Sequence, residues 1–98
     1  MKNQDYITKA MNKETFELRD MESFTTWEEA KPFLIEVGKQ ARKIANANAD
    51  SFFAKKMMNE VEEAYFRALK ADCGFMVNVN AETAMGWFIK MVNTYGIN

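Results

Sequence analysis

The segment 51–73, SFFAKKMMNEVEEAYFRALKADC, constrains the fold more than any other part of this chain. At 100° per residue it forms a helix whose charged side chains mostly share one stripe about 100° wide, with apolar side chains over most of the remaining surface. The apolar residues form two flanks, Phe53, Met57, Val61, Ala64, Ala68 and Ala71 on one side and Phe52, Met58, Tyr65, Phe66, Leu69 and Cys73 on the other. Such a helix must be covered on two sides, so we expect it to be central in the domain or shared with a second chain.

A second helical pattern precedes this segment. Thr26 and Glu29 stand three residues apart, as in a capping box, and predict the start of a helix. Apolar residues then recur at spacings of 3, 4, 3, 4 and 3, at Trp27, Ala30, Leu34, Val37, Ala41 and Ile44. Pro32 lies too deep in this helix to be tolerated freely, so we expect a kink or a restart there. Gly38 weakens the helix by up to about 1 kcal/mol relative to alanine and leaves room for another helix to approach.

The two helical patterns are separated by residues 46–50, Asn-Ala-Asn-Ala-Asp. Asn and Asp favour turns and caps, and Asp50 or Ser51 is placed to cap the second helix. The pattern predicts an antiparallel helical hairpin with helices at 27–46 and 51–73 and a tip at 46–51. One continuous helix over 32–72 is the alternative, because alanine is the best helix former.

The chain after the hairpin predicts one strand and one helix. Gly74 has the character of a C′ residue that ends the second helix. Residues 75–80, Phe-Met-Val-Asn-Val-Asn, alternate with a period of two, which favours a short strand. Asn80 then caps a last helix over 81–95, closed by Gly96. Its inward-facing residues are expected to be Met85, Phe88, Val92 and Tyr95.

The first 25 residues carry weaker patterns. Residues 5–11 predict a short helix, with Ile7, Ala10 and Met11 inward. Residues 15–21 alternate apolar Phe16 and Leu18 with charged residues and favour a strand, which would pair with 75–80 as a two-stranded ribbon.

A length of 98 residues is enough for one core without disulfides or metal and too short for two. The predicted fold class is therefore mainly α, a single domain over 1–98. It consists of the antiparallel helical hairpin and a C-terminal helix packed across it, with the small two-stranded β element as a further expectation.

The composition excludes several function classes. The 13 basic and 14 acidic residues give a net charge of −1, which argues against a general nucleic-acid binder and against an acidic DNA mimic. There is no histidine and only one cysteine, so an intrachain disulfide and the usual zinc sites are ruled out, and a reducing, cytoplasmic compartment is the simplest expectation. No run approaches 18 apolar residues, so no membrane association is expected.

No group of residues meets the requirements of a catalytic, metal or cofactor site. Residues 46–50 resemble half of a calcium loop, but Ser51 and Met57 stand where that loop needs glycine and a bidentate glutamate. Glu60 and Glu63 share the charged stripe with basic residues, which favours a solvated face. Cys73 lies at a predicted helix C-terminus without a histidine to activate it. We expect no enzyme activity and no cofactor.

The predicted function is a non-enzymatic protein-interaction module. Excess apolar, aromatic and Met-rich surface favours self-association, with a homodimer as one outcome, and action as a small regulator or inhibitor that occupies a surface of a larger partner protein. The predicted interaction face consists of Phe52, Met58, Tyr65, Phe66, Leu69, Trp87 and Met91.

The alternative is a binder of a nucleotide or nucleic-acid phosphate. Basic residues end the first helix and open the second, where they oppose the helix dipole, so the hairpin would gather them at its tip as an anion site. The residues of this predicted basic tip are Lys39, Arg42, Lys43, Lys55 and Lys56.

Overall fold

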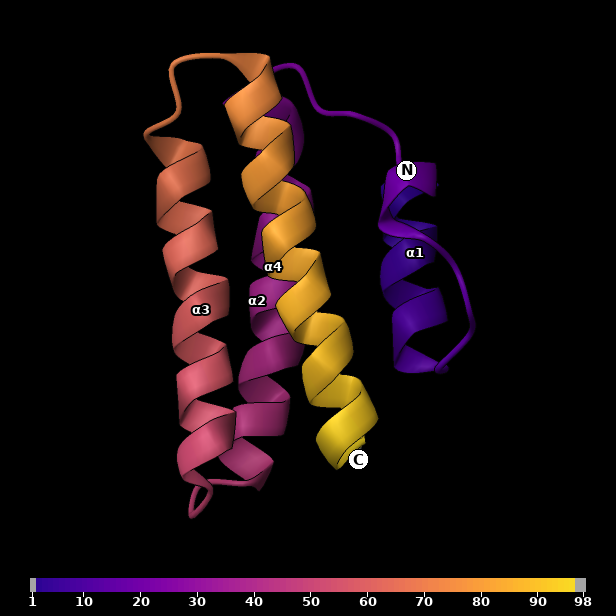
Figure 1. The fold of residues 1–98 in the computed structure, drawn as a ribbon, viewed down its shortest axis with the longest axis vertical. Helices are drawn as coiled ribbons and strands as arrows, with labels where there is room; N and C mark the ends of the chain where they lie inside the picture. The colour runs from indigo at the N-terminus through magenta and orange to yellow at the C-terminus, as the bar shows by residue number, and fades with distance from the viewer. Residues whose placement is uncertain (1, 97–98) are drawn as a thin grey trace.

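The computed structural model describes residues 2–96, which form four α-helices and one short 3-10 helix (Figure 1). The elements are α1 (Lys2–Met11), η1 (Leu18–Asp20), α2 (Trp27–Ala47), α3 (Phe52–Leu69) and α4 (Gly74–Tyr95). The mainly α fold is confirmed. The expected β element is wrong, because no residue in 2–96 belongs to a strand.

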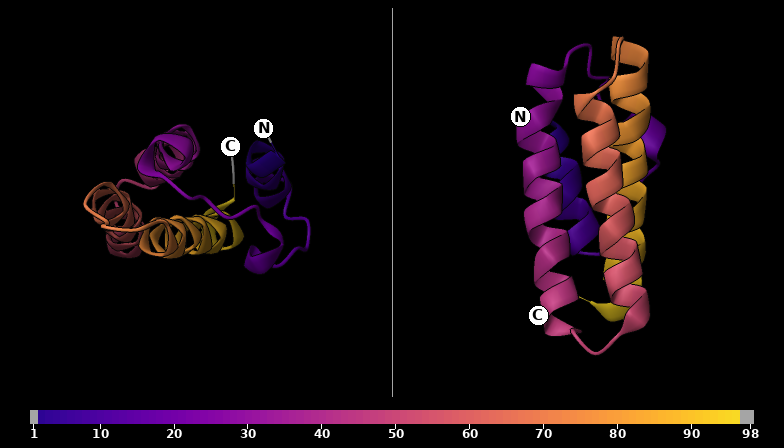
Figure 2. Two further views of the ribbon diagram at one scale, coloured as in Figure 1. Left: turned by 90° about the horizontal axis from the view of Figure 1, so that it is seen from above. Right: turned by 90° about the vertical axis from the view of Figure 1, so that its left-hand side faces the viewer.

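Helices α2, α3 and α4 form a three-helix bundle, and α1 packs against α2 and α4 (Figure 2). Seen along the helix axes, α3, α4 and η1 lie in one row, and α2 and α1 lie in a second row beside it (Figure 2, left). Helix α3 is covered on two sides, by α2 and α4, as its two apolar flanks require. Helix α4, however, is the element that contacts α1, η1, α2 and α3, so it and not α3 is the centre of the molecule.

The start of α2 confirms the predicted cap in a modified form. Thr26 Oγ1 accepts a hydrogen bond from the Glu29 backbone N–H at 3.2 Å. The Glu29 carboxylate reaches back to the backbone N–H and the hydroxyl of Thr25, at 3.2 and 2.9 Å, one residue earlier than in a capping box. The expected restart at Pro32 is wrong, because α2 runs through it. Pro32 and Glu28 are both exposed, so water can solvate the carbonyl that loses its helical partner.

The hairpin turn is held by three side chains. Asn48 Nδ2 donates to the Ile44 carbonyl at 2.8 Å and closes α2. Ser51 Oγ accepts from the Ala54 backbone N–H at 3.2 Å and caps α3, as predicted. The same hydroxyl lies 2.5 Å from the Tyr95 hydroxyl, which ties the turn to the end of α4. The alternative of one continuous helix over 32–72 is therefore wrong.

Helix α4 begins seven residues earlier than predicted, at Gly74. The strand expected at 75–80 is its first two turns, and Gly74 opens this helix instead of closing α3, which ends at Leu69. Asn80 is not a cap. Its buried side chain donates to the Met76 carbonyl one turn back, at 2.9 Å. Gly96, with a φ of 80°, closes α4 as predicted.

Polar contacts join the start of α1 to the segment before α2. Asn3 is buried, and its amide donates to the Glu22 carbonyl at 3.0 Å and accepts from the Glu22 N–H at 2.9 Å. The short helix is confirmed, with Ile7 and Ala10 buried. The strand expected at 15–21 is wrong. Its apolar side chains do turn inward, as shown by the Phe16 ring 5.1 Å from that of Tyr6, but the described part of the chain has no strand that could pair with the segment.

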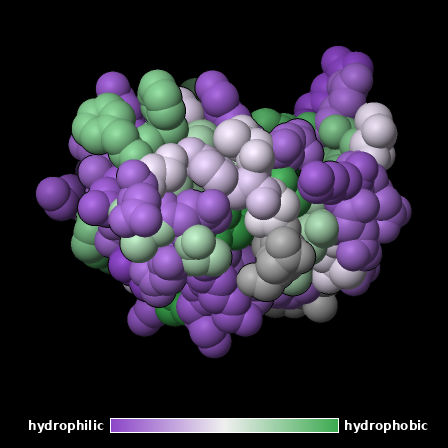
Figure 3. Space-filling model, turned by 90° about the horizontal axis from the view of Figure 1, so that it is seen from below, coloured by the Kyte–Doolittle hydropathy of each residue, from purple (hydrophilic) through white to green (hydrophobic). Residues whose placement is uncertain are grey.

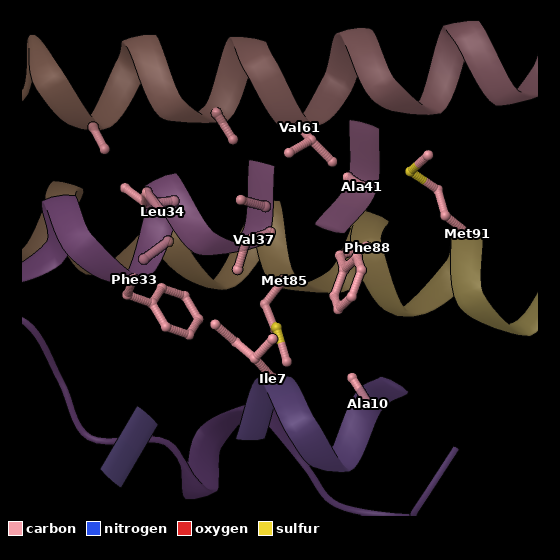
Figure 4. Close-up of a cluster of buried hydrophobic side chains, with 14 of the residues drawn as sticks. Ile7, Ala10, Phe33, Leu34, Val37, Ala41, Val61, Met85, Phe88 and Met91 are labelled. Carbon is pink, nitrogen blue, oxygen red and sulfur yellow. The ribbon is translucent and has the colours of Figure 1, made fainter. Parts of the chain in front are cut away.

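One core joins all four helices (Figure 4). Ile7 and Ala10 of α1 point toward α4 from one side, and Val61 of α3 points in from the other. The largest fully buried apolar side chains come from α2, α3 and α4, and are Phe33, Phe88, Leu34, Met85, Met91, Val37, Val61 and Val92.

Candidate interaction surfaces

The structure does not bring the residues of the predicted interaction face onto one surface. Met58 and Met91 are buried, and Met91 points toward α3 inside the core (Figure 4). Phe52 is exposed at the start of α3, whereas Phe66 and Leu69 are exposed near its end. The remaining two are half-buried, Tyr65 against Trp27 with ring centroids 5.1 Å apart and Trp87 on the α4 side of the groove between α3 and α4.

Four cations of the predicted basic tip are divided among three hollows, and the fifth, Lys55, is exposed in the first turn of α3. Arg42 Nη2 lies 2.8 Å from Glu62 Oε2, in an ion pair between α2 and α3, and Lys39 lines the same groove. Lys43 faces a hollow between α2 and the end of α4, while Lys56 lines the groove between α3 and α4. The hollow at the turn itself is lined by residues 47–51, none of which is basic.

The first candidate surface is the groove between α2 and α3, which encloses about 280 Å³. Ile35 stands on its α2 bank with 42% of its surface exposed, and Phe66 on its α3 bank with 51% exposed. Leu34, Met58, Val61 and Tyr65 complete the apolar lining. The Arg42–Glu62 pair and Lys39 form its polar rim. We call this surface the α2/α3 groove.

Gly38 also lines the α2/α3 groove, in the interior of α2. A glycine at such a position costs a helix roughly 0.5–1 kcal/mol relative to alanine. A Cβ atom at Gly38 would have no neighbour within 4 Å, so packing within the chain does not require glycine there. The missing side chain instead opens the groove beside Ile35.

The second candidate surface is the outer face of α4. Two grooves border it, one of about 600 Å³ toward α3 and one of about 530 Å³ toward η1. Trp87 and Lys90 line both, so the two grooves adjoin along α4. Phe53 and Lys56 line the far bank on α3, and Leu18 lines the far bank on η1.

Several phenylalanines are more exposed than folding of the chain alone would explain. Phe52, Phe53 and Phe75 are 70%, 68% and 73% exposed. Phe52 and Phe53 pack edge to face, with ring centroids 6.0 Å apart, and lie at the turn end of the molecule. From that end, an exposed apolar patch is visible over the α3 side (Figure 3). Burying such side chains in water-excluding contacts is favourable, by about 25 cal/mol per Å² of apolar surface.

Within residues 2–96, no group of three or more His, Cys, Asp or Glu side chains is arranged to hold a metal ion. Cys73 is exposed in the loop before α4 and its side chain does not cap that helix. None of the described helices is long and apolar enough to cross a lipid bilayer.

No match was found when the sequence was compared with models of protein families, with curated proteins and with solved structures.

Sequence reasoning missed the exposed residues that stand on the α4 face. The sequence predicts Phe75 and Val79 in a strand, and it does not indicate that half-buried Gly86 of α4 and Leu18 of η1 line a groove beside Val79. A signal for the first two was present, because Val77, Ala81, Ala84 and Phe88 recur with helical spacing and extend the last helix upstream. With that helix extended, Phe75 and Val79 fall on its outer face.

Proposed function

We propose that this chain is a non-enzymatic protein-interaction module that regulates or inhibits a larger protein by occupying one of its surfaces. The observation that carries the proposal is the α2/α3 groove, where exposed Ile35 and Phe66 flank an opening left by Gly38. Large apolar side chains at the edge of a groove are typical anchors of protein interfaces.

An amphipathic helix of the partner is the occupant that best fits this groove. A helix presents apolar residues three and four positions apart, which match two parallel banks such as those of α2 and α3. The space at Gly38 lets the backbone of that helix come close to α2. Arg42 is already paired with Glu62, whereas no ion pair within residues 2–96 involves Lys39. An acidic residue of the partner would therefore be favoured opposite Lys39.

Affinity capture from the native host with matched variants tests this function. Phe66→Glu places a charge on the α3 bank of the groove, and Phe53→Glu makes the same change at a side chain that lines the groove between α3 and α4 instead. We expect a partner that is retained by the wild type and by Phe53→Glu and lost with Phe66→Glu, because a buried unpaired charge costs several kcal/mol. A partner that is retained equally by both variants would contradict the role of this groove.

A second candidate function has support from a different observation. Lys56 of α3 and Lys90 of α4 line one groove together with Phe53 and Trp87, a combination that suits an anionic ligand with an aromatic ring. Adenosine triphosphate titrated against Trp87 fluorescence, in a Trp27→Phe background, tests it. Binding should weaken with salt and disappear in Lys56→Glu. Absence of any fluorescence change up to millimolar nucleotide would remove this candidate.

A further inference from the structure

We propose that a second copy of this chain packs on the outer face of α4, with the two α4 helices antiparallel and related by a two-fold axis at Gly86. The dimer is the self-association predicted from the sequence, and it uses a surface different from the α2/α3 groove of the proposed function. It follows from Gly86, from the charges on either side of it and from the apolar residues at the two ends of the helix.

Gly86 lies in the interior of α4, where glycine destabilises a helix relative to alanine. A Cβ atom there would meet only Leu18 Cδ1, at 3.7 Å, which is an ordinary contact. Gly74 in the same helix is different, because its Cβ would lie 2.6 Å from the Thr25 carbonyl oxygen. Packing within the chain therefore requires Gly74 but not Gly86. A glycine on an exposed helix face lets the backbone of a second helix approach closely.

The charges around Gly86 are self-complementary in one orientation only. Glu82 is four residues before Gly86 and Lys90 four residues after it, so both lie on the outer face of α4. An antiparallel arrangement with its axis at Gly86 places Glu82 of each copy opposite Lys90 of the other, and the pair occurs twice. A parallel arrangement would place like charges together. Within one copy the two side chains are separated by eight residues, about 12 Å along the helix, and do not pair.

The apolar residues of this face match under the same operation. Phe75 and Val79 are exposed at the start of α4, and Phe53 is exposed on α3 beside its last turns. An antiparallel partner brings Phe75 and Val79 of one copy close to the end of the other copy where Phe53 lies. The face of the molecule viewed in Figure 1 measures 37 by 26 Å, with α4 in front. That is enough for the roughly 800 Å² per subunit of a standard interface.

Sedimentation equilibrium over a range of protein concentrations tests the dimer through a charge exchange. Glu82→Lys and Lys90→Glu each replace two attractive contacts by two repulsive ones, and at up to about 1 kcal/mol for each exposed contact the dissociation constant should rise about tenfold or more. The double variant Glu82→Lys/Lys90→Glu should restore the wild-type constant, because the opposite charges face each other again. Glu82 also accepts a hydrogen bond from the Asn78 side-chain amide at 2.7 Å, which Glu82→Lys would remove. Glu82→Gln is the control for this loss, because it removes the charge but keeps an acceptor for the Asn78 amide.

Gly86→Gln provides an independent arm, because it blocks the close approach without changing the charges. We expect it to abolish the dimer while thermal unfolding of the monomer stays unchanged or moves upward. The proposal is overturned by a wild-type chain that is monomeric at all concentrations, or by a dimer that Gly86→Gln leaves intact. It is equally overturned if the double charge variant fails to restore association. Loss of partner capture in Phe66→Glu does not depend on any of these results, so the two proposals fail separately.

Discussion

Two Gly→Ala substitutions in α4 should change the stability of the chain in opposite directions. At Gly74 the added Cβ would lie 2.6 Å from the Thr25 carbonyl oxygen and 3.0 and 3.1 Å from Cα and C of the same residue. Ordinary contacts begin at 3.4 Å, so the Thr25 backbone has to move by about 0.8 Å. These neighbours are backbone atoms, and no rotation of a side chain can relieve the clash.

The backbone around Thr25 is fixed on both sides. Phe24 is buried, with its ring 5.3 Å from that of Phe33, and its N–H donates to Asn78 Oδ1 at 3.1 Å. Thr26 on the other side caps α2. Overpacking of this kind costs about 1–3 kcal/mol, from which the gain in helix propensity, below about 1 kcal/mol, must be subtracted. We expect Gly74→Ala to lose about 1–2 kcal/mol of unfolding free energy, which lowers the unfolding temperature by roughly 4–8 °C per kcal/mol.

Gly86→Ala is the matched control for Gly74→Ala. Its Cβ makes one ordinary contact, with Leu18, so the monomer should gain about 0.5–1 kcal/mol from helix propensity alone. Urea unfolding followed by circular dichroism, at a concentration low enough to keep the chain monomeric, gives both values from the midpoints if the slopes agree. A Gly74→Ala variant at least as stable as the wild type would contradict the clash with Thr25, as would a Gly86→Ala variant that is less stable than Gly74→Ala.

The remaining predictions concern the cap of α3, the hydrogen bonds between Asn3 and Glu22, and the core. Ser51→Ala removes the cap of α3 and the partner of the Tyr95 hydroxyl, so it should cost about 1–2 kcal/mol in urea unfolding, with Tyr95→Phe losing less because the cap stays. Asn3→Leu leaves both backbone groups of Glu22 without their partner and should cost about 1–3 kcal/mol. In that variant the amide hydrogen-exchange rates of α1 should rise more than those of the other helices. A uniform rise along the chain would argue against a local role of Asn3 in holding α1. Phe88→Ala should cost about 3–5 kcal/mol, and a loss below about 1 kcal/mol would contradict its place in the core.

The hairpin could be predicted from the sequence because local and long-range signals agree there. The apolar positions predicted to face inward on α2 are buried from Ala30 to Ile44. Thr26 and Ser51 are caps, and the polar residues between the helices form the turn. The restart considered at Pro32 does not occur, because the effect of a proline depends on whether water can reach the carbonyl that loses its partner. That exposure is a property of the folded bundle.

The candidate surfaces could be predicted less well, because periodicity gives the angle of a residue around its helix but not which neighbour covers it. Met58 and Met91 were expected at the surface, yet α2 covers the first and α3 the second. The basic residues were expected together because they are close in sequence to one turn. In the structure Lys39 and Arg42 line the α2/α3 groove, Lys43 lines a hollow toward the end of α4, and Lys56 lines the groove between α3 and α4. Arg42 pairs with Glu62 across the α2/α3 groove. Ion pairs between residues 20 positions apart leave no local signal.

The error at 75–80 follows from the same surface that carries the dimer proposal. Residues at i and i+4 share one side of a helix, and the residue between them at i+2 lies on the opposite side. Apolar Phe75 and Val79 with apolar Val77 between them therefore read as a strand, although Val77 enters the core and the other two are exposed. A helix with one apolar face and one polar face cannot produce this alternation. The pattern arises because the first two turns of α4 carry exposed Phe75 and Val79 on the outer face, whereas Glu82 and Lys90 follow on the same face further along the helix.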